Sequence, residues 1–564
     1  MLFNPKKAQF DHLDERSREI MKKTIAFFET KGKKQLKEDS HERIWYDDFL
    51  QFIKKEGIFA ELLTPTRYGG DGCRWDTFRN MDFNEILGFY SLAHWYTWQV
   101  TILGLGPIWM GKNEAVKKKT ARLLEEGGIF AFGLSEKEHG ADLYASDMAL
   151  TPMGDGQYRA DGGKYYIGNG NEAALVSTFA KNSETDEYAF FVVDAKHENY
   201  ECVQNVVNSQ MYVSEYALHG YPLTDDDILT MGRDAWDSSL NTINVGKYNL
   251  GWASIGICSH AFYEAIDHAA NRFLFKHYVT DFPHIRQIFV DAYARLCAMR
   301  MFATRAADYM RSASADDRRY LLYNPMVKMK VTTQGEEVIN LLWDVIAAKG
   351  FEKDTYFEMA ARDIRALPKL EGTVHVNMAL IVKFMANYFF NPGQFPEIGK
   401  MDAPGHDTFL FDQGPTKGLG KIQFHDYNIA YNSLDLPNIG IFKEQIALLV
   451  ELLMTAAPDK DQVKDIDFLL NLGELFTLVA YGQLLIEKTK IDAVGDDIVD
   501  QIFDFMVRDF SRFALQLYSK TSSTPKQMEI SMKMIKKPTV NPERFNRVWE
   551  EHVYSLKGAY QMNN

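Results

Sequence analysis

One glutamate is the clearest candidate for acid–base chemistry in this sequence. Glu371 lies in the segment ARDIRALPKLEGT, where Arg362 and Asp363 precede it and Gly372 and Thr373 follow it. A carboxylate held beside a substrate can act as a general base, and burial raises its pKa toward the working pH. The plain alternative is a solvated glutamate at the start of a helix, because Glu-Gly-Thr alone is a trivial tripeptide.

Two upstream segments combine glycines with polar and aromatic side chains. The first, FGLSEKEHGAD (132–142), places Ser135 and a glutamate before a glycine turn. The second, DGGKYYIGNG (161–170), places Tyr166 between a lysine and Gly168. Taken alone, the first segment predicts a strand–turn–strand and the second a glycine-rich hairpin. The order of the two segments along the chain argues against coincidence.

Several standard signatures are absent from the sequence. After Gly104 and Gly106, Trp109 stands where a dinucleotide fingerprint requires glycine, and there is neither a P-loop nor an HExxH motif. The four cysteines lie far apart, with no CxxC pair and no metal-ligand spacing. We therefore predict no metal site and a reducing compartment. The formal net charge of −14 argues against nucleic acid as a partner.

The pattern along the chain changes from helical to β and back to helical. Its 564 residues favour two to four structural units, and 46% hydrophobic residues suffice for several cores. We predict a helical domain at 1–128, a β domain at 129–240, a helical bundle containing Glu371 at 241–395, and a linker with a further helical domain at 396–564. Without an apolar signal segment or a long uncharged apolar run, no transmembrane segment is predicted and we expect a soluble cytoplasmic protein.

Together, the three segments resemble the acyl-CoA dehydrogenase family of flavoproteins. Arg362-Asp363 and Glu371-Gly372-Thr373 match the family's RD…EGT signature in register. The resemblance covers about residues 10–390 and implies an α+β, mainly α fold. Its expected parts are an N-terminal helical domain, a middle β-barrel domain, a four-helix-bundle domain and, as in longer members, an extra C-terminal helical domain.

The resemblance also implies an activity. It is FAD-dependent α,β-dehydrogenation of an acyl-CoA thioester to trans-2-enoyl-CoA, as in fatty acid and lipid metabolism. Glu371 would remove the α-proton, and flavin N5 would accept the β-hydride. The expected electron acceptor is an electron-transferring flavoprotein, and the expected assembly is a homodimer or homotetramer.

Site residues follow from the resemblance position by position. The implied cofactor contacts are Phe132, Leu134, Ser135, Ala141, Tyr166, Gly168, Arg272, Phe275, Asp344, Ala348, Thr373 and His375. The implied substrate contacts are Ala141, Asn244, Lys247, Leu370 and Gly372. Ser135 would face the flavin pyrimidine ring, and Tyr166 stands where a tryptophan packs on the flavin. Arg272 would bind the FAD pyrophosphate, typically that of a neighbouring subunit.

Some positions depart from the family pattern. Gly168 stands where a threonine or serine commonly bonds flavin N5, so that side-chain bond is missing. Ala347 and Ala348 replace two glycines beside the adenosine, Lys276 replaces another glycine, and Ala141 replaces a serine. Because extra methyl groups take up room at a close backbone approach, we expect altered or weaker binding of the adenosine half of FAD.

Alternatives to this interpretation stay open. An acyl-CoA oxidase or a flavin monooxygenase would share the fold, and so would a catalytically weak partner subunit. Trp95, Tyr96 and Trp98 fall in the helical stretch that closes the acyl pocket in relatives, although aromatic residues at that spacing are also typical of a core. The segment 526–538 could lie on a membrane or form a solvated helix with a packed methionine face.

Overall fold

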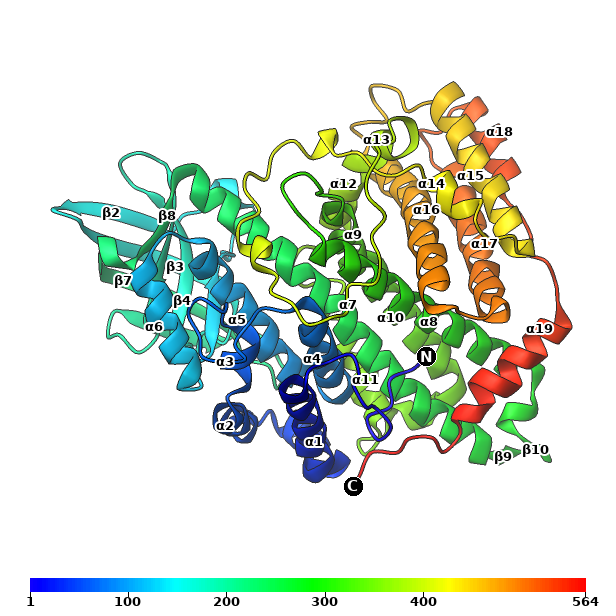
Figure 1. Ribbon diagram of the computed structural model, residues 1–564, viewed down its shortest axis with the longest axis horizontal. Coiled ribbons are helices and arrows are strands. Elements are labelled where there is room, and N and C mark those ends of the chain that lie inside the picture. The colour runs from blue at the N-terminus through cyan, green and yellow to red at the C-terminus, as the bar shows by residue number, and fades with distance from the viewer. Residues whose placement is uncertain (141) are drawn as a thin grey trace. The chain divides into compact units, whose positions relative to one another are not determined.

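The computed structural model describes residues 1–140 and 142–564, which form two compact units. Unit 1 comprises Met1–Ala8, Leu250–Met401 and Gly418–Gln561. Unit 2 comprises Gln9–Asn249, Asp402–Lys417 and Met562–Asn564. The described residues are mainly helical with one large sheet, as the predicted α+β class requires (Figure 1). The division into four domains stays a prediction.

Unit 2 begins with helices. They are α1 (Glu15–Glu42), α2 (Asp47–Glu56), α3 (Ile58–Leu63), α4 (Thr77–Tyr90), α5 (Leu92–Met110) and α6 (Glu114–Glu125). Side-chain caps start several of them: the Asp76 carboxylate accepts backbone N–H bonds of α4, and the Asn113 side chain does the same for α6. α5 is apolar all round and buried along nearly its whole length, as a central core helix must be.

The glycines near position 104 serve close packing of α5. A Cβ at Gly104 would lie 2.6 Å from the backbone nitrogen of Ala131, and a Cβ at Gly106 would lie 2.4 Å from Oγ1 of Thr242. No side chain fits at either approach. The helix therefore packs tightly against strand β1 (Phe130–Gly133) and against the N-terminal part of helix α7 (Gly232–Asn271).

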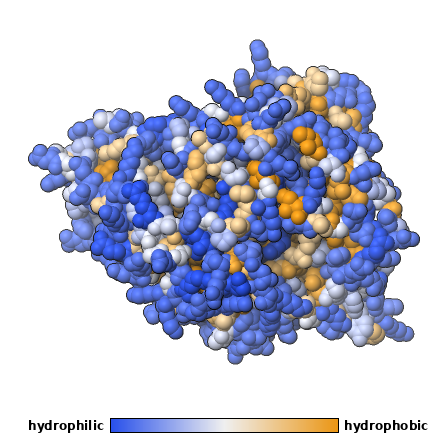
Figure 2. All heavy atoms as spheres, in the orientation of Figure 1, coloured by the Kyte–Doolittle hydropathy of each residue, from blue (hydrophilic) through white to orange (hydrophobic). Residues whose placement is uncertain are grey.

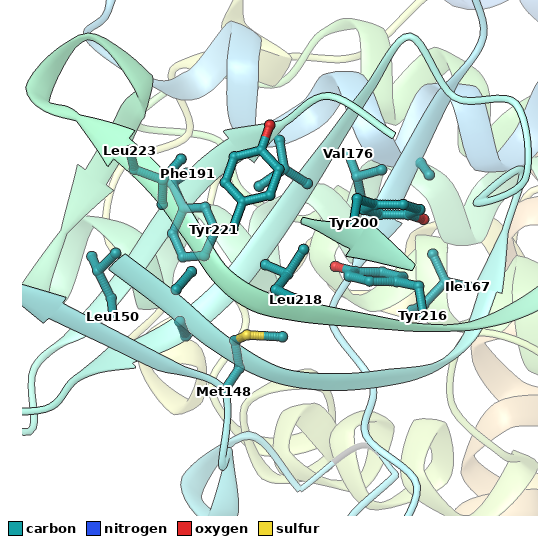
Figure 3. Close-up of a cluster of buried hydrophobic side chains, with 14 of the residues drawn as sticks. Met148, Leu150, Ile167, Val176, Phe191, Tyr200, Tyr216, Leu218, Tyr221 and Leu223 are labelled. Atoms are coloured by element: carbon teal, nitrogen blue, oxygen red, sulfur yellow. The ribbon is translucent and has the colours of Figure 1, made fainter. Parts of the chain in front are cut away.

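The sheet of unit 2 has eight strands. Besides β1 they are β2 (Ala149–Gly154), β3 (Gln157–Gly168), β4 (Leu175–Asn182), β5 (Tyr188–Val193), β6 (Tyr200–Asn205), β7 (Val213–Thr224) and β8 (Ile228–Met231). Their order is β6-β7-β3-β2-β4-β5-β8, and β1 pairs in parallel with β4. Buried side chains such as Met148, Leu150, Phe191 and Tyr216 fill the core between the strands (Figure 3). The sheet lies within residues 129–240, where the sequence predicts β structure.

Unit 1 is built from long helices. After α7 come the hairpin β9 (Phe273–Leu274) and β10 (His277–Tyr278), then α8 (Pro283–Arg311), α9 (Tyr320–Met326), α10 (Thr332–Ile346), α11 (Tyr356–Asp363), α12 (Val374–Ile381) and α13 (Met385–Phe390). A π-helical stretch, Val327–Val331, joins α9 to α10. The C-terminal helices are α14 (Tyr427–Tyr431), α15 (Pro437–Thr455), α16 (Ile466–Asp492), α17 (Asp496–Tyr518), α18 (Pro525–Met534) and α19 (Pro542–Arg547).

Buried ion pairs and apolar packing join the C-terminal helices to the rest of unit 1. Arg295 of α8 donates to both carboxylate oxygens of Asp509 in α17, at 2.8 and 3.0 Å. Helix α18 packs on its neighbours α15 and α17 with Ile530 and Met534 buried, whereas Met532 is 51% exposed, so the methionine face predicted as one alternative for 526–538 is packed only in part. The additional C-terminal region is therefore helical, as expected.

Among residues 1–140 and 142–564, one helix has the length and apolar composition that a membrane span would need. It is α16, and 83% of its apolar window is buried inside the protein, which the core helix of a soluble protein also shows. Figure 2 shows a mainly hydrophilic face on which hydrophobic side chains appear in places over the C-terminal helices. Ile429 and Met454 are among the exposed apolar residues of this region.

Candidate functional site

The loop that carries Glu371 has an unusual backbone. Glu371 has a φ of 53° and Gly372 a φ of 85°, so a glutamate occupies the left-handed region that normally favours glycine. Thr373 then caps α12 by accepting the N–H of Val376. Glu371 is half-buried. The sequence Glu-Gly-Thr thus forms a sharp turn that ends at a helix start.

The buried side chain of Lys328 holds the loop that carries Glu371. The ammonium of Lys328 donates to the carbonyl oxygens of Pro368 and Gly372, at 2.7 and 2.5 Å. The side chain of Asn377 adds a bond of 3.0 Å to the same Gly372 oxygen. A buried ammonium requires such oxygen partners, because burial of an unpaired charge is costly. One cation therefore pins the chain on both sides of Glu371.

The position of Lys328 depends on the π-helical stretch. Val327–Val331 is π-helical, and Lys328 is fully buried within it. Such bulges occur often at functional sites because they re-aim side chains that a regular helix would direct elsewhere. In the loop before Glu371, the side chain of Lys369 donates to Glu336 of α10 at 2.7 Å. The loop before Glu371 is thus fixed by contacts within unit 1.

In unit 2, the segment that begins at the end of β1 with FGLSE (132–136) is organised by a buried ion pair. The ammonium of Lys164 donates to Oε1 of Glu136 at 2.7 Å and to the Leu134 carbonyl at 3.1 Å. Burial alone would raise the pKa of Glu136, but the Lys164 ammonium and hydrogen bonds from Ser146 and the Asp147 backbone bring that pKa below its usual value. The pair fixes the turn that presents Ser135.

Three potential metal ligands come together beside this ion pair. Ligand atoms of Glu136, His139 and Asp147 lie within 4.8 Å of one another. Glu136 is engaged with Lys164, and Nε2 of His139 bonds to Asp147 at 2.6 Å. These internal bonds account for the cluster as part of the turn.

Tyr166 lies on β3 in a strained and exposed position. Its φ is 64°, and 60% of the residue is exposed. An aromatic residue rarely adopts this backbone conformation, and an exposed aromatic ring leaves a large apolar face in water. Both features suit a ring that stacks on a planar ligand.

At the end of β3, Asn169 ties the strand to α5. Its side chain donates to the carbonyls of Thr97 and Phe130 and to the Thr101 hydroxyl, and it accepts from the Thr97 hydroxyl, all within 3.2 Å. Asn169 is fully buried. Because every polar atom of the Asn169 amide is used, Gly168 is held in a fixed register against the helix.

The stretch expected to be a linker packs in part against α7. Within Asp402–Lys417, Gly414 accepts a bond from Asn241 at 2.9 Å, and Oε1 of Gln413 lies 3.4 Å from Nδ2 of Asn244. Asn244 and Lys247 are each only 8% exposed. These two predicted substrate contacts are therefore buried within unit 2.

Comparisons with known proteins agree with the resemblance. Residues 234–386 match the model of the acyl-CoA dehydrogenase C-terminal domain. The very long-chain specific acyl-CoA dehydrogenase of Rattus norvegicus mitochondria is 26% identical over 359 residues, which cover 60% of this chain and 52% of that protein. Subunit CarC of the caffeyl-CoA reductase–Etf complex of Acetobacterium woodii is 22% identical over 341 residues, which cover 59% and 88%.

A solved structure extends the agreement over the whole chain. The acyl-CoA dehydrogenase from Bacillus anthracis complexed with FAD superposes with a TM-score of 0.75 at 17% identity, covering 98% of this chain and 97% of that one. Residues 234–386 thus match the acyl-CoA dehydrogenase C-terminal domain, and the chain as a whole has the acyl-CoA dehydrogenase fold. The fold predicted from the resemblance is confirmed, including the C-terminal helical region. The chain spans about half the length of the mitochondrial relatives that it matches.

The similarity to acyl-CoA dehydrogenases supports FAD as the cofactor, and the residues present suit it in two places. Tyr166, predicted to pack on the flavin, offers an exposed ring, and Phe275 at the β9–β10 hairpin, predicted to contact FAD, is 87% exposed. Phe275 and Lys276 have φ values of 51° and 69°, so Lys276 has a backbone conformation that glycine adopts without strain. Ala347, with a φ of 55°, also has a positive φ at the second departure.

The other predicted site residues can be placed unit by unit. Asp344 and Ala348 are exposed near the end of α10, Arg272 is exposed before the hairpin, and Thr373 and His375 are exposed around the start of α12. Leu370 is half-buried and directly precedes Glu371. In unit 2, the Leu134 N–H donates to the Phe132 carbonyl at 3.0 Å, so these backbone groups bond within the turn. Ala141 lies outside the described residues.

Sequence reasoning missed two positioning residues. Lys328 lies in the run MVKMK, where a lysine reads as a solvated helix residue, and only its carbonyl partners identify its function. Asn169 lies in the second segment, DGGKYYIGNG, where an asparagine between two glycines is a signal for a left-handed turn, and its φ is 62°.

Proposed function

We propose that this chain is an FAD-dependent acyl-CoA dehydrogenase that converts an acyl-CoA thioester to a trans-2-enoyl-CoA. The observation that carries the proposal is the strained Glu371 on a loop pinned by Lys328. Strain of this kind costs about 1–3 kcal/mol and persists only where the surroundings impose it. It is typical of functional sites, and Glu371 is the residue that the family signature identifies as the base.

Glu371 would take the α-proton of the thioester. Its backbone N–H would donate to the thioester carbonyl and so stabilise the charge that develops there. Lys328 and Gly372 fix the loop, so the carboxylate is positioned before the substrate binds. Bound FAD would supply the acceptor for the β-hydride.

The acceptor, assembly and location of the protein belong to the same proposal. We propose an electron-transferring flavoprotein as electron acceptor, supported by the name of the relative CarC, a subunit of a reductase–Etf complex. Hydrogen peroxide formed during turnover in air would instead identify an acyl-CoA oxidase. We further propose a cytoplasmic homodimer acting in fatty acid metabolism, which size-exclusion chromatography with light scattering and cell fractionation would test.

Replacement of Glu371 by glutamine tests the proposal directly. Glu371→Gln keeps the size of the side chain and removes the base, so FAD should stay bound while bleaching by a panel of acyl-CoAs slows about 100- to 10,000-fold. Exchange of the substrate α-proton with deuterated water should slow in parallel. The matched control is Glu352→Gln, an exposed glutamate of the same unit, which should behave as wild type. Turnover of Glu371→Gln near the wild-type rate would refute the role of Glu371.

A catalytically weak partner subunit is the second candidate. The burial of Asn244 and Lys247 beside Asp402–Lys417 favours it, because these residues stand where relatives flank the substrate. A purified protein that stays colourless after addition of FAD would favour this candidate, whereas bleaching of bound flavin by an acyl-CoA would exclude it.

A further inference from the structure

Gly168 has no room for a side chain, and a tyrosine occupies the space. An ideal Cβ built on Gly168 would lie 2.7 Å from Cε1 and 2.9 Å from Cζ of Tyr96, and 2.7 Å from Cγ1 of Val100. Real Cβ atoms do not approach neighbouring carbons so closely. Glycine at 168 is therefore required by the two side chains that α5 presents there.

The rest of α5 fixes where Tyr96 lies. The indole N–H groups of Trp95 and Trp98 both donate to Oδ1 of Asn84, at 2.8 and 3.1 Å, and both rings are fully buried. These two aromatic residues are therefore core, as one of the alternatives predicted. Tyr96 and Val100, four residues apart, share another face of the helix.

Asn169 sets the same register from the strand. Its amide bonds to Thr97 and Thr101, which are the residues directly after Tyr96 and Val100. Thus Gly168 meets one pair of helix positions and Asn169 meets the adjacent pair. The contact between Tyr96 and Gly168 is fixed by these buried hydrogen bonds.

The phenol oxygen of Tyr96 can stand in for the missing hydroxyl. A serine or threonine at 168 would carry its oxygen one bond beyond Cβ, and Tyr96 carries its oxygen one bond beyond Cζ, which lies 2.9 Å from that Cβ position. We propose that Tyr96 takes the place of the side chain absent at Gly168 and directs its hydroxyl to the N5 edge of the flavin. This inference rests on the proposed function, because it requires bound FAD.

The first test concerns the exchange of space and needs no cofactor. Tyr96→Ala, Gly168→Ser and the double variant form a thermodynamic cycle on urea unfolding, in which Val100 is present throughout and cancels. Gly168→Ser should destabilise the wild type and be better tolerated beside Tyr96→Ala, with a coupling of at least about threefold in the unfolding constant. Additive effects would overturn the proposal.

The second test concerns the hydroxyl and uses FAD as the probe. Tyr96→Phe keeps the ring and removes the oxygen, so FAD should bind about 3- to 10-fold more weakly, the factor for one net hydrogen bond, and the visible flavin bands should shift. Tyr158→Phe, at the other end of β3 and bonded to Asp225, is the control and should change neither. Wild-type affinity and spectrum in Tyr96→Phe would overturn the role of the hydroxyl.

The two tests separate failure of the inference from failure of the proposed function. A wild-type chain that takes up no FAD would overturn the proposed function and with it the flavin role of Tyr96. Coupling in the unfolding cycle would then show that only the space is exchanged. With FAD bound to the wild type, the cycle and the Tyr96→Phe titration each overturn the inference independently.

Discussion

Ala347 offers a sharp test of how the protein tolerates its departures from the family pattern. It ends α10 with φ 55° and ψ −135°, and its N–H donates to the Trp343 carbonyl. A Cβ in this region clashes with the backbone, at a cost of about 1–3 kcal/mol. Glycine removes the clash but loses about 0.5–1 kcal/mol through its greater freedom in the unfolded chain. Ala347→Gly should therefore stabilise the protein by about 1 kcal/mol.

The neighbouring alanine provides a matched control. Ala348 is also exposed, but its φ is not positive, so glycine there brings only the entropic cost. Ala348→Gly should destabilise by about 0.5–1 kcal/mol. The two variants, which remove the same methyl group one residue apart, should thus differ by about 2 kcal/mol with opposite signs.

Urea unfolding followed by tryptophan fluorescence would measure the difference. Because the chain has two compact units, the relevant midpoint is that of the transition that includes unit 1, and equal slopes in the two variants are needed to convert midpoints into free energies. Destabilisation by Ala347→Gly equal to that by Ala348→Gly would show that Ala347 is not strained, and would refute the argument that its backbone is that of a glycine.

Three further perturbations have expected outcomes. Lys328→Met leaves the Pro368 and Gly372 carbonyls without their cation and should lower the free energy of unfolding in urea by about 2–3 kcal/mol. Lys330→Met, in the same π-helical stretch, leaves those two carbonyls bonded and serves as the control. Burial lowers the pKa of His94 from 6.5 to about 3, so as the pH falls the unfolded chain binds this proton before the folded chain does. The wild type should therefore lose about 2 kcal/mol of its free energy of unfolding between about pH 6.5 and pH 5. His94→Phe should lose less, as paired unfolding curves at the two pH values would show. Lys276→Gly should raise stability by about 1 kcal/mol in the same assay, and a loss would contradict the left-handed turn.

The sequence predicted what depends on periodicity and on registered motifs. The helical patterns at 1–128 and 241–395 indicated helices in those ranges, and the β pattern at 129–240 indicated the sheet. The sequence singles out Glu371 because Arg362-Asp363 precedes it in register, and the structure shows in addition that the backbone of Glu371 is strained. These features are local, so a sequence pattern is sufficient to predict them.

The features that sequence reasoning missed depend on contacts between distant residues. A lysine in an amphipathic run gives no sign that its ammonium binds two carbonyls some forty residues away, as Lys328 does. Likewise, Gly168 read as the loss of a hydrogen-bonding side chain, because the tyrosine that takes its space is on another element. The stretch before residue 418 read as a linker, and its hydrogen bonds to α7 carry no sequence signature.

The departures from the family pattern therefore fall into two physical kinds. Lys276 and Ala347 have positive φ values, which glycine adopts freely and which strain a residue with a side chain. At Gly168 the side chain is absent, and Tyr96 fills the space from the helix. Restoring glycine at 276 or 347 should thus change stability and FAD affinity in the same direction, whereas restoring serine at 168 alone should reduce stability. Strained positions persist only where the surrounding structure imposes them, so the strain at Lys276 and Ala347 argues for a site under constraint.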